Sequence, residues 1–143
     1  QDALENLRDL ARGIYPPLLA DKGLVLALEA QARKASMPID IVPDGVGRYP
    51  QEVEAAVYFS ILEALQNTAK YANASRASVA LEQRYGSLTF EVRDDGAGFD
   101  PEARGYGTGL QGIADRLAAL DGAVHVRSAV GAGTVVTGSL PIR

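Results

Sequence analysis

The sequence predicts an α+β domain, built as a two-layer α/β sandwich with a mixed, mostly antiparallel sheet. Residues 76–84 and 87–93 alternate apolar and polar side chains around Tyr85-Gly86, which is the pattern of a β-hairpin. Residues 51–72 carry apolar side chains at every third or fourth position, which is the period of a helix. Because the expected strands and helices mix without strict alternation, the pattern favours the two-layer sandwich.

The other elements follow from similar patterns. Pro16-Pro17 is expected to end a first helix, and Asp21 to start a second. Thr108 and Gln111 match a capping box at the start of a later helix, which Asp121-Gly122 is expected to end. The remaining elements expected are helices over 2–14, 21–35 and 110–120, and strands over 38–42, 123–129 and 134–141.

Composition limits the possible functions. The 143 residues suit one domain with its own core, and we expect them to be a piece of a longer protein. The formal charge is −4 and the basic residues do not cluster, which argues against a nucleic-acid surface. The absence of cysteine excludes disulfides and thiolate metal sites. No apolar run reaches the length of a membrane span.

A glycine-rich stretch from Asp94 to Leu110 joins an expected strand to an expected helix. Five of its seventeen residues are glycine. Glycine allows positive φ and close approach of backbone to a ligand, and a helix start offers unpaired N–H groups to an anion. The stretch therefore indicates an anion site, although a flexible surface connection explains glycines alone equally well.

One face of the helix over 51–72 carries an acid, an amide and an amine. Glu63, Asn67 and Lys70, with Tyr71 beside them, fall at i, i+4, i+7 and i+8. For most helices such a face is simply solvated. A functional role for these side chains is favoured only when the motifs that follow along the chain are considered with them.

Four features stand in one order: this helix face, D-x-G-x-G at 94–98, G-x-G-x-G at 105–109 and G-x-G-T at 131–134. Together they resemble the ATP-binding domain of sensor histidine kinases, in the superfamily that also holds gyrase, the Hsp90 chaperones and the MutL mismatch-repair ATPases. Residues 62–72 resemble that family's asparagine box. Residues 7–24 resemble the join between dimerisation helix and ATP domain in the nitrate-sensor-like branch.

The resemblance implies a Bergerat-type ATP-binding fold, with helices on one face of the sheet. It also implies two parts of the chain. Residues 1–17 would be the tail of an upstream dimerisation helix with its join, and residues 18–143 the ATP-binding catalytic domain.

For the base of the nucleotide, the resemblance implies that Asp94 accepts a hydrogen bond from the adenine amino group, with Thr134 supporting the carboxylate. Guanine presents a carbonyl there, and two facing acceptors in a dry pocket are penalised. ATP is therefore expected over GTP. Gly96 and Gly98 would let the chain turn beside the base.

For the phosphates, the resemblance implies that Asn67 binds Mg²⁺ and that Lys70 pairs with phosphate as a point charge. The backbone of Gly107 and Gly109 would donate to the triphosphate. The set of expected nucleotide-binding residues is completed by Tyr71, Gly105, Thr108 and Leu110. Glu63 is expected to be catalytic, either as a general base or by ordering Asn67 and the metal.

Two departures from the family pattern affect the expected binding. Tyr71 stands where the family often has histidine. The interval from Phe99 to Arg104 is only six residues, so the lid over the nucleotide is expected to be short. We therefore expect weak, fast-exchanging binding of ATP.

The acceptor of the phosphoryl group is expected to lie outside this sequence. His125 is the only histidine and stands on an expected strand between two valines, where an ordinary structural role is favoured. The resemblance places the acceptor upstream, in a dimerisation domain of the same protein. It further implies a response regulator as partner, a homodimeric full-length protein and a cytoplasmic location, free or attached to a membrane-bound sensor.

Other functions are compatible with parts of the sequence. An anti-sigma-factor-type serine protein kinase has a similar domain and length, and a natural start near Gln1 would favour it. A mechanical ATPase needs a longer lid and a transducer domain. A binding module with a degenerate site is disfavoured by Glu63, Asn67, Asp94 and the three glycine clusters.

Overall fold

The computed structural model describes residues 16–67, 74–96, 108–128, 131 and 133–142. The helix expected over 2–14 lies outside this part of the chain. No helix within the described ranges is both long and apolar enough to cross a bilayer. The elements in order are α2 (Pro17–Lys22), α3 (Leu24–Lys34), β1 (Ile39–Asp44), α4 (Gln51–Asn67), β2 (Ala77–Arg84), β3 (Ser87–Asp94), α5 (Thr108–Ala118), β4 (Ala123–Ser128) and β5 (Thr134–Pro141).

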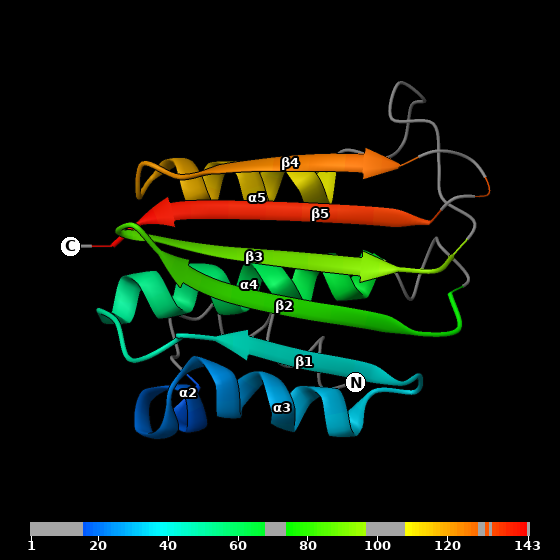
Figure 1. Cartoon of the computed structure of the whole chain (residues 1–143), viewed down its shortest axis with the longest axis horizontal. Helices are drawn as coiled ribbons and strands as arrows, with labels where there is room; N and C mark the ends of the chain where they lie inside the picture. The colour runs from blue at the N-terminus through cyan, green and yellow to red at the C-terminus, as the bar shows by residue number, and fades with distance from the viewer. Residues whose placement is uncertain (1–15, 68–73, 97–107, 129–130, 132, 143) are drawn as a thin grey trace.

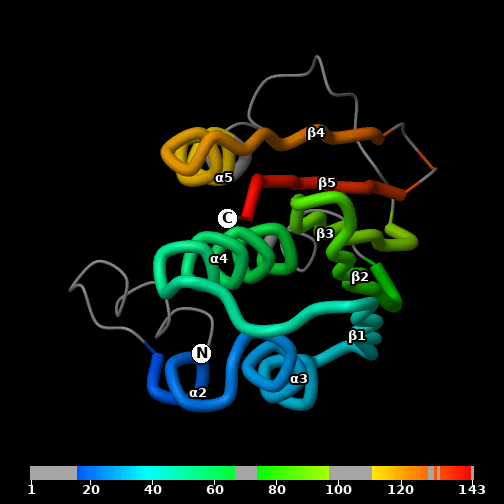
Figure 2. Tube along the Cα trace, turned by 60° about the vertical axis from the view of Figure 1, so that its left-hand side comes forward, coloured from blue at the N-terminus to red at the C-terminus, as the bar shows by residue number. Residues whose placement is uncertain are grey.

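The five strands form one mixed sheet in the order β1-β2-β3-β5-β4. The β1–β2 pair is parallel and the other three pairs are antiparallel (Figure 1). Figure 2 shows the described helices gathered on one side of the strands. The predicted α+β sandwich with helices on one face is therefore confirmed.

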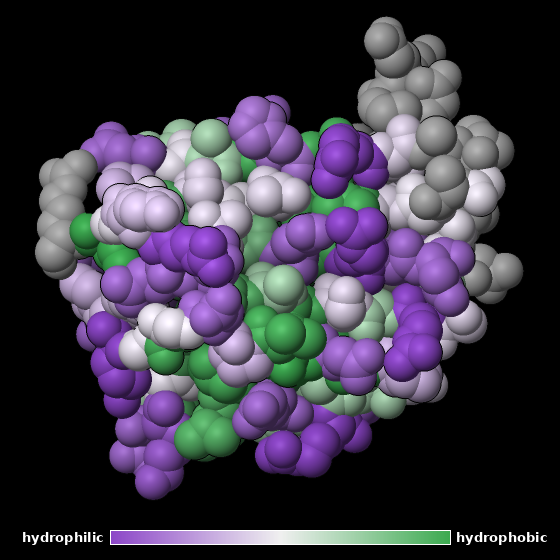
Figure 3. Space-filling model, in the orientation of Figure 1, coloured by the Kyte–Doolittle hydropathy of each residue, from purple (hydrophilic) through white to green (hydrophobic). Residues whose placement is uncertain are grey.

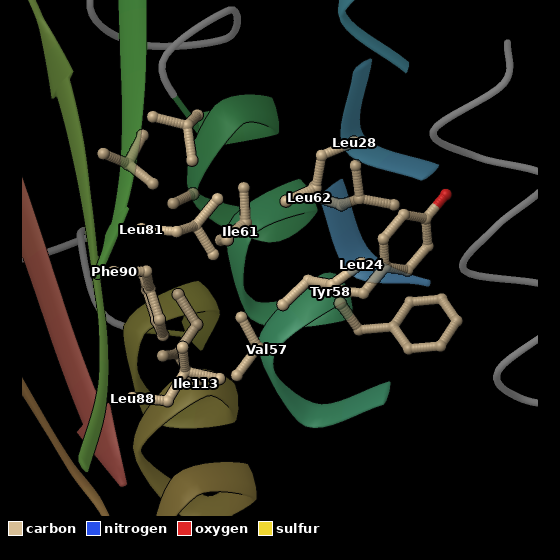
Figure 4. Packing of buried hydrophobic residues seen from close by; sticks show 14 of the residues in the cluster. Leu24, Leu28, Val57, Tyr58, Ile61, Leu62, Leu81, Leu88, Phe90 and Ile113 are labelled. Atoms are coloured by element: carbon tan, nitrogen blue, oxygen red, sulfur yellow. The ribbon is translucent and has the colours of Figure 1, made fainter. Parts of the chain in front are cut away.

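The core lies between the sheet and these helices (Figure 4). Helix α4 supplies Val57 and Ile61, four residues apart on one face, as its apolar period predicts. They pack in one cluster with Phe90 of β3 and with side chains of the other helices. Fully buried members of this cluster include Leu19, Leu24, Leu28, Leu81, Leu88, Ile113, Leu117 and Leu140.

None of the described helices lies over the opposite face of the sheet, which is turned toward the viewer in Figure 1 and drawn as a surface in Figure 3. Buried and partly exposed positions alternate along β3 and β5, as expected for strands that are covered on one side only. His125 is exposed on β4, so its expected position on a strand is confirmed.

The single helix predicted over 21–35 is wrong. Helix α2 begins at Pro17, where proline suits the first helical turn, and Gly23 separates it from α3. Gly23 has a φ of 93°, and a Cβ there would lie 2.6 Å from Cδ of Arg48. The break therefore needs glycine for both its backbone conformation and its contact with Arg48.

The end of α5 also differs from expectation. The helix stops at Ala118, and the left-handed residue is Asp121, with a φ of 64°. The N–H of Gly122 donates to the Leu117 carbonyl at 2.7 Å and that of Asp121 to the Ala118 carbonyl at 3.1 Å, as in a Schellman motif. Gly122 is needed for a different reason, because a Cβ there would overlap the Ser139 carbonyl oxygen.

Candidate functional site

The Asp94 side chain lies at the end of a central strand and is 8% exposed. Its backbone is flanked by Ala77 on β2 and by Thr134 on β5. The Gly96 N–H donates to Asp94 Oδ1 at 2.8 Å. Because a buried carboxylate needs donors, this turn orients Asp94 while the strands on both sides fix its backbone.

The turn before β5 packs directly against Asp94. Gly133 has a φ of 76°, and a Cβ there would overlap the Asp94 carbonyl oxygen. Thr134 follows and is 4% exposed. The G-x-G-T motif thus ends at the Asp94 backbone, and glycine is required for that close approach.

Ser128, at the end of β4, supports this turn and was not singled out from the sequence. Its Oγ donates to the Gly133 carbonyl at 3.0 Å and lies 2.9 Å from Thr134 Oγ1. Ser128 faces Thr134 across the β4–β5 ladder. This contact depends on the register of β4 against β5, which no local motif indicates.

Asp95, the residue after Asp94, is hydrogen-bonded to the segment that precedes β2. Its carboxylate accepts hydrogen bonds from the Ser75 hydroxyl, from the Ser75 N–H at 2.8 Å and from the Arg76 N–H at 3.1 Å. These bonds, the one from the Ser75 hydroxyl above all, hold the pKa of Asp95 below its ordinary value. In the motif D-x-G-x-G this residue is the variable position, so sequence reasoning missed its role.

Glu63 lies on α4 and faces α5. Its Oε1 is 3.4 Å from Arg116 Nη1, and the two side chains are 16% and 22% exposed. Asn67, four residues further on, is the last residue of α4. The two predicted residues therefore lie on the same helix.

The remaining predicted residues divide into two groups. Helix α5 begins at Thr108, and Gly109 and Leu110 lie in its first turn. Gln111 donates to Asp115 at 2.8 Å. Lys70, Tyr71, Gly98, Gly105 and Gly107 lie outside the described residues, as does the expected lid.

The donor chemistry suits a weakly ligated metal. Within the described residues, no group of three or more His, Asp or Glu side chains could hold a metal ion. Mg²⁺ takes one or two protein ligands and completes its shell with phosphate oxygens and water, so a single asparagine on α4 fits it.

An open hollow of about 380 Å³ lies between α3 and β1. It is lined by Glu29, Ala32, Arg33, Ile39, Asp40 and Ile41. None of the residues predicted to bind nucleotide lines it, so we do not place the site there.

The family described as histidine kinase-, DNA gyrase B- and HSP90-like ATPases matches residues 52–143, which is more than half of the chain. The chain therefore belongs to this family. The match includes α4 from its second residue, the Asp94 turn, the start of α5 and the turn before β5.

Two curated relatives of this chain are named as histidine kinases. The chain is 32% identical over 161 residues to the signal transduction histidine-protein kinase/phosphatase DegS of Brevibacillus brevis. It is 30% identical over 146 residues to the oxygen sensor histidine kinase NreB of Staphylococcus carnosus. The matches cover 99% and 97% of this chain but 42% of each relative, so the chain spans less than half of their length.

Solved structures share the fold. The blue-light activated histidine kinase of Erythrobacter litoralis EL346 superposes with a TM-score of 0.68 at 22% identity, over 83% of this chain and 42% of that one. The ATP-binding domain of PrrB from Mycobacterium tuberculosis superposes with a TM-score of 0.66 at 19% identity, over 84% of this chain and 91% of that one.

Proposed function

We propose that this chain is the ATP-binding catalytic domain of a two-component sensor histidine kinase. The observation that carries the proposal is the buried Asp94 carboxylate, oriented by the Gly96 N–H and backed by Gly133 and Thr134. Family membership and the histidine kinases among the relatives support it.

In this proposal Asp94 accepts a hydrogen bond from the adenine amino group. A charged acceptor strengthens that bond, and guanine would place a second acceptor against it. Gly96 and Gly98 turn the chain beside the base, and Thr134 supports the carboxylate. The domain therefore selects ATP over GTP.

The triphosphate would lie between α4 and the start of α5. Asn67 would hold Mg²⁺, which neutralises phosphate charge when bound. Lys70 and Tyr71 follow on the chain and would contact phosphate. The backbone at the start of α5 would donate to phosphate oxygens, and this group comprises Gly105, Gly107, Thr108, Gly109 and Leu110.

The proposed reaction moves the γ-phosphoryl group of ATP to a histidine nitrogen. The bond from the γ-phosphorus to the bridging oxygen breaks, ADP leaves, and a phosphorus–nitrogen bond forms. Glu63 is the catalytic carboxylate of the domain, and the acceptor lies in a dimerisation domain outside these residues. The phosphoryl group then passes to a response regulator, within a protein that is a cytoplasmic homodimer or the cytoplasmic part of a membrane-bound one.

The test is phosphorylation of the full-length protein with γ-labelled ATP. We expect label that is lost in acid and kept in base, as for phosphohistidine, and no label on this chain when it is incubated alone. Acid-stable label on a protein partner would instead support the serine kinase, which the relatives do not favour. Stable label on His125 would contradict an acceptor outside the chain.

A further inference from the structure

The Glu63 carboxylate is seated on one face of α5. Arg116 Nη1 lies 3.4 Å from Glu63 Oε1, and a Cβ added to Gly112 would lie 2.9 Å from Glu63 Oε2. Gly112 and Arg116 are four residues apart and therefore neighbours on the helix surface. One residue makes room for the carboxylate and the other supplies the opposite charge.

The Glu63–Arg116 ion pair is partly shielded from solvent, which favours a fixed arrangement of the two side chains. Both side chains are less than a quarter exposed, so their attraction is screened less than that of a surface pair. Asp115, the acidic neighbour of Arg116, already accepts a hydrogen bond from Gln111. Arg116 is therefore left to supply the cationic partner of Glu63.

The Glu63–Arg116 ion pair lies close to both parts of the proposed nucleotide site. Asn67 lies one turn beyond Glu63 on α4, and the start of α5 lies two turns before Arg116. The ion pair therefore ties the helix of the proposed metal ligand to the helix of the proposed phosphate site. A change in the length of the ion pair would move the Glu63 carboxylate and would also change the distance between α4 and α5.

We propose that Arg116 is a positioning residue that holds the Glu63 carboxylate in place for phosphoryl transfer. This inference rests on the proposed function. Arg116 acts through Glu63 and need not touch the nucleotide. Gly112 contributes to the same arrangement, because a side chain at this position would displace the Glu63 carboxylate.

The experiment measures autophosphorylation of the full-length protein for Arg116→Met, Arg116→Lys, Glu63→Gln and the double variant Glu63→Gln/Arg116→Met. Because loss of a positioned acid or base costs about 10²-fold or more, we expect Arg116→Met to lower kcat by at least about tenfold and KM for ATP to change little. Arg116→Lys should restore most of the rate. In the Glu63→Gln background, Arg116→Met should have no further effect.

Two further variants separate this role from general damage. Arg84→Met removes the same charge at the hairpin end of β2, where the arginine pairs with Asp44 and Glu82, and should leave the rate unchanged. Gly112→Ala favours the helix by about 0.8–1.0 kcal/mol, so it should keep the fold while lowering kcat. This variant tests the proposal even if Arg116→Met fails to fold.

Several results would overturn the inference while leaving the proposed function intact. These are a normal rate in both Arg116→Met and Gly112→Ala, a loss confined to KM, or effects of Glu63→Gln and Arg116→Met that multiply. A wild-type protein that neither binds ATP nor becomes labelled would instead remove the proposed function, and this inference with it.

Discussion

Asp95 shows how one side chain holds the turn after β3 to the segment that precedes β2. Its carboxylate accepts hydrogen bonds from Ser75 and Arg76, and these bonds favour the charged form. Its pKa in the folded protein is consequently lower than the ordinary value of 3.8. The stabilisation is therefore complete above the unfolded-state pKa and is lost as pH falls through the lower folded-state pKa.

Asp95→Asn should accordingly lose part of the pH dependence of stability. We expect the free energy of unfolding of the wild type to fall more steeply than that of the variant as pH falls through and below the ordinary value of 3.8. Urea unfolding at a series of pH values measures this. Parallel pH profiles for the two proteins would contradict the assigned contacts.

At the same scale, the residues that could be predicted are those whose neighbours in the motif are also neighbours in space. Asp94 and Gly96 share one turn, so the motif alone placed them together. Ser128 and Arg116 were missed because their contacts depend on strand register and on the packing of α4 against α5. Neither relation is visible in a local pattern.

Among the elements, the β2–β3 hairpin has a strained turn residue that the site does not use. Tyr85 has a φ of 53°, Gly86 has a φ of 76°, and the Tyr85 side chain is 100% exposed. A two-residue turn with two positive φ values is the type I′ geometry, which favours Asn-Gly. Tyrosine there costs free energy and packs against nothing.

Tyr85→Asn should raise the free energy of unfolding by about 0.5–1 kcal/mol. Nucleotide affinity should not change, because Asp94 lies at the other end of β3. Urea unfolding and a binding titration check the two parts. Lower stability, or altered affinity, would show that this turn has a role that its exposure hides.

The positions of helices and strands could be predicted where a regular apolar period marks the buried face of the element. The apolar stripe of α4 and the alternation of β2 and β3 predicted these elements closely. The break at Gly23 was missed, because the apolar period of the residues around it does not report the positive φ of that glycine. Asp121 was also missed as the left-handed residue, since glycine at position 122 is the stronger local signal.

At the scale of the whole molecule, a buried carboxylate on α4 links that helix to α2 through Arg48. Glu54 on α4 is 1% exposed and accepts hydrogen bonds from Arg48 Nε at 3.1 Å and from the Tyr49 N–H at 3.2 Å. Arg48 also donates to the carbonyls of Ala20 and Asp21 at the end of α2. This network fixes α2 relative to the helix that carries Glu63.

Glu54→Gln should lower the free energy of unfolding by about 1.5–3 kcal/mol, because it weakens charge-assisted bonds to a buried group. The exposed Glu52 in the same turn provides the control, and Glu52→Gln should change stability by less than about 0.5 kcal/mol. Chemical denaturation compares them. Equal effects would mean that the buried network contributes nothing particular to the assembly of the domain.

The proposed contact between Asp94 and adenine can be tested by calorimetric titration of Mg-ATP into this chain. We expect the wild type to bind with a micromolar or weaker Kd, and to prefer ATP over GTP. Asp94→Asn should bind neither measurably while keeping its fold by circular dichroism. Asp44→Asn, which makes the same change at the far end of the sheet, should bind as the wild type does. Unchanged ATP binding by Asp94→Asn would contradict the account.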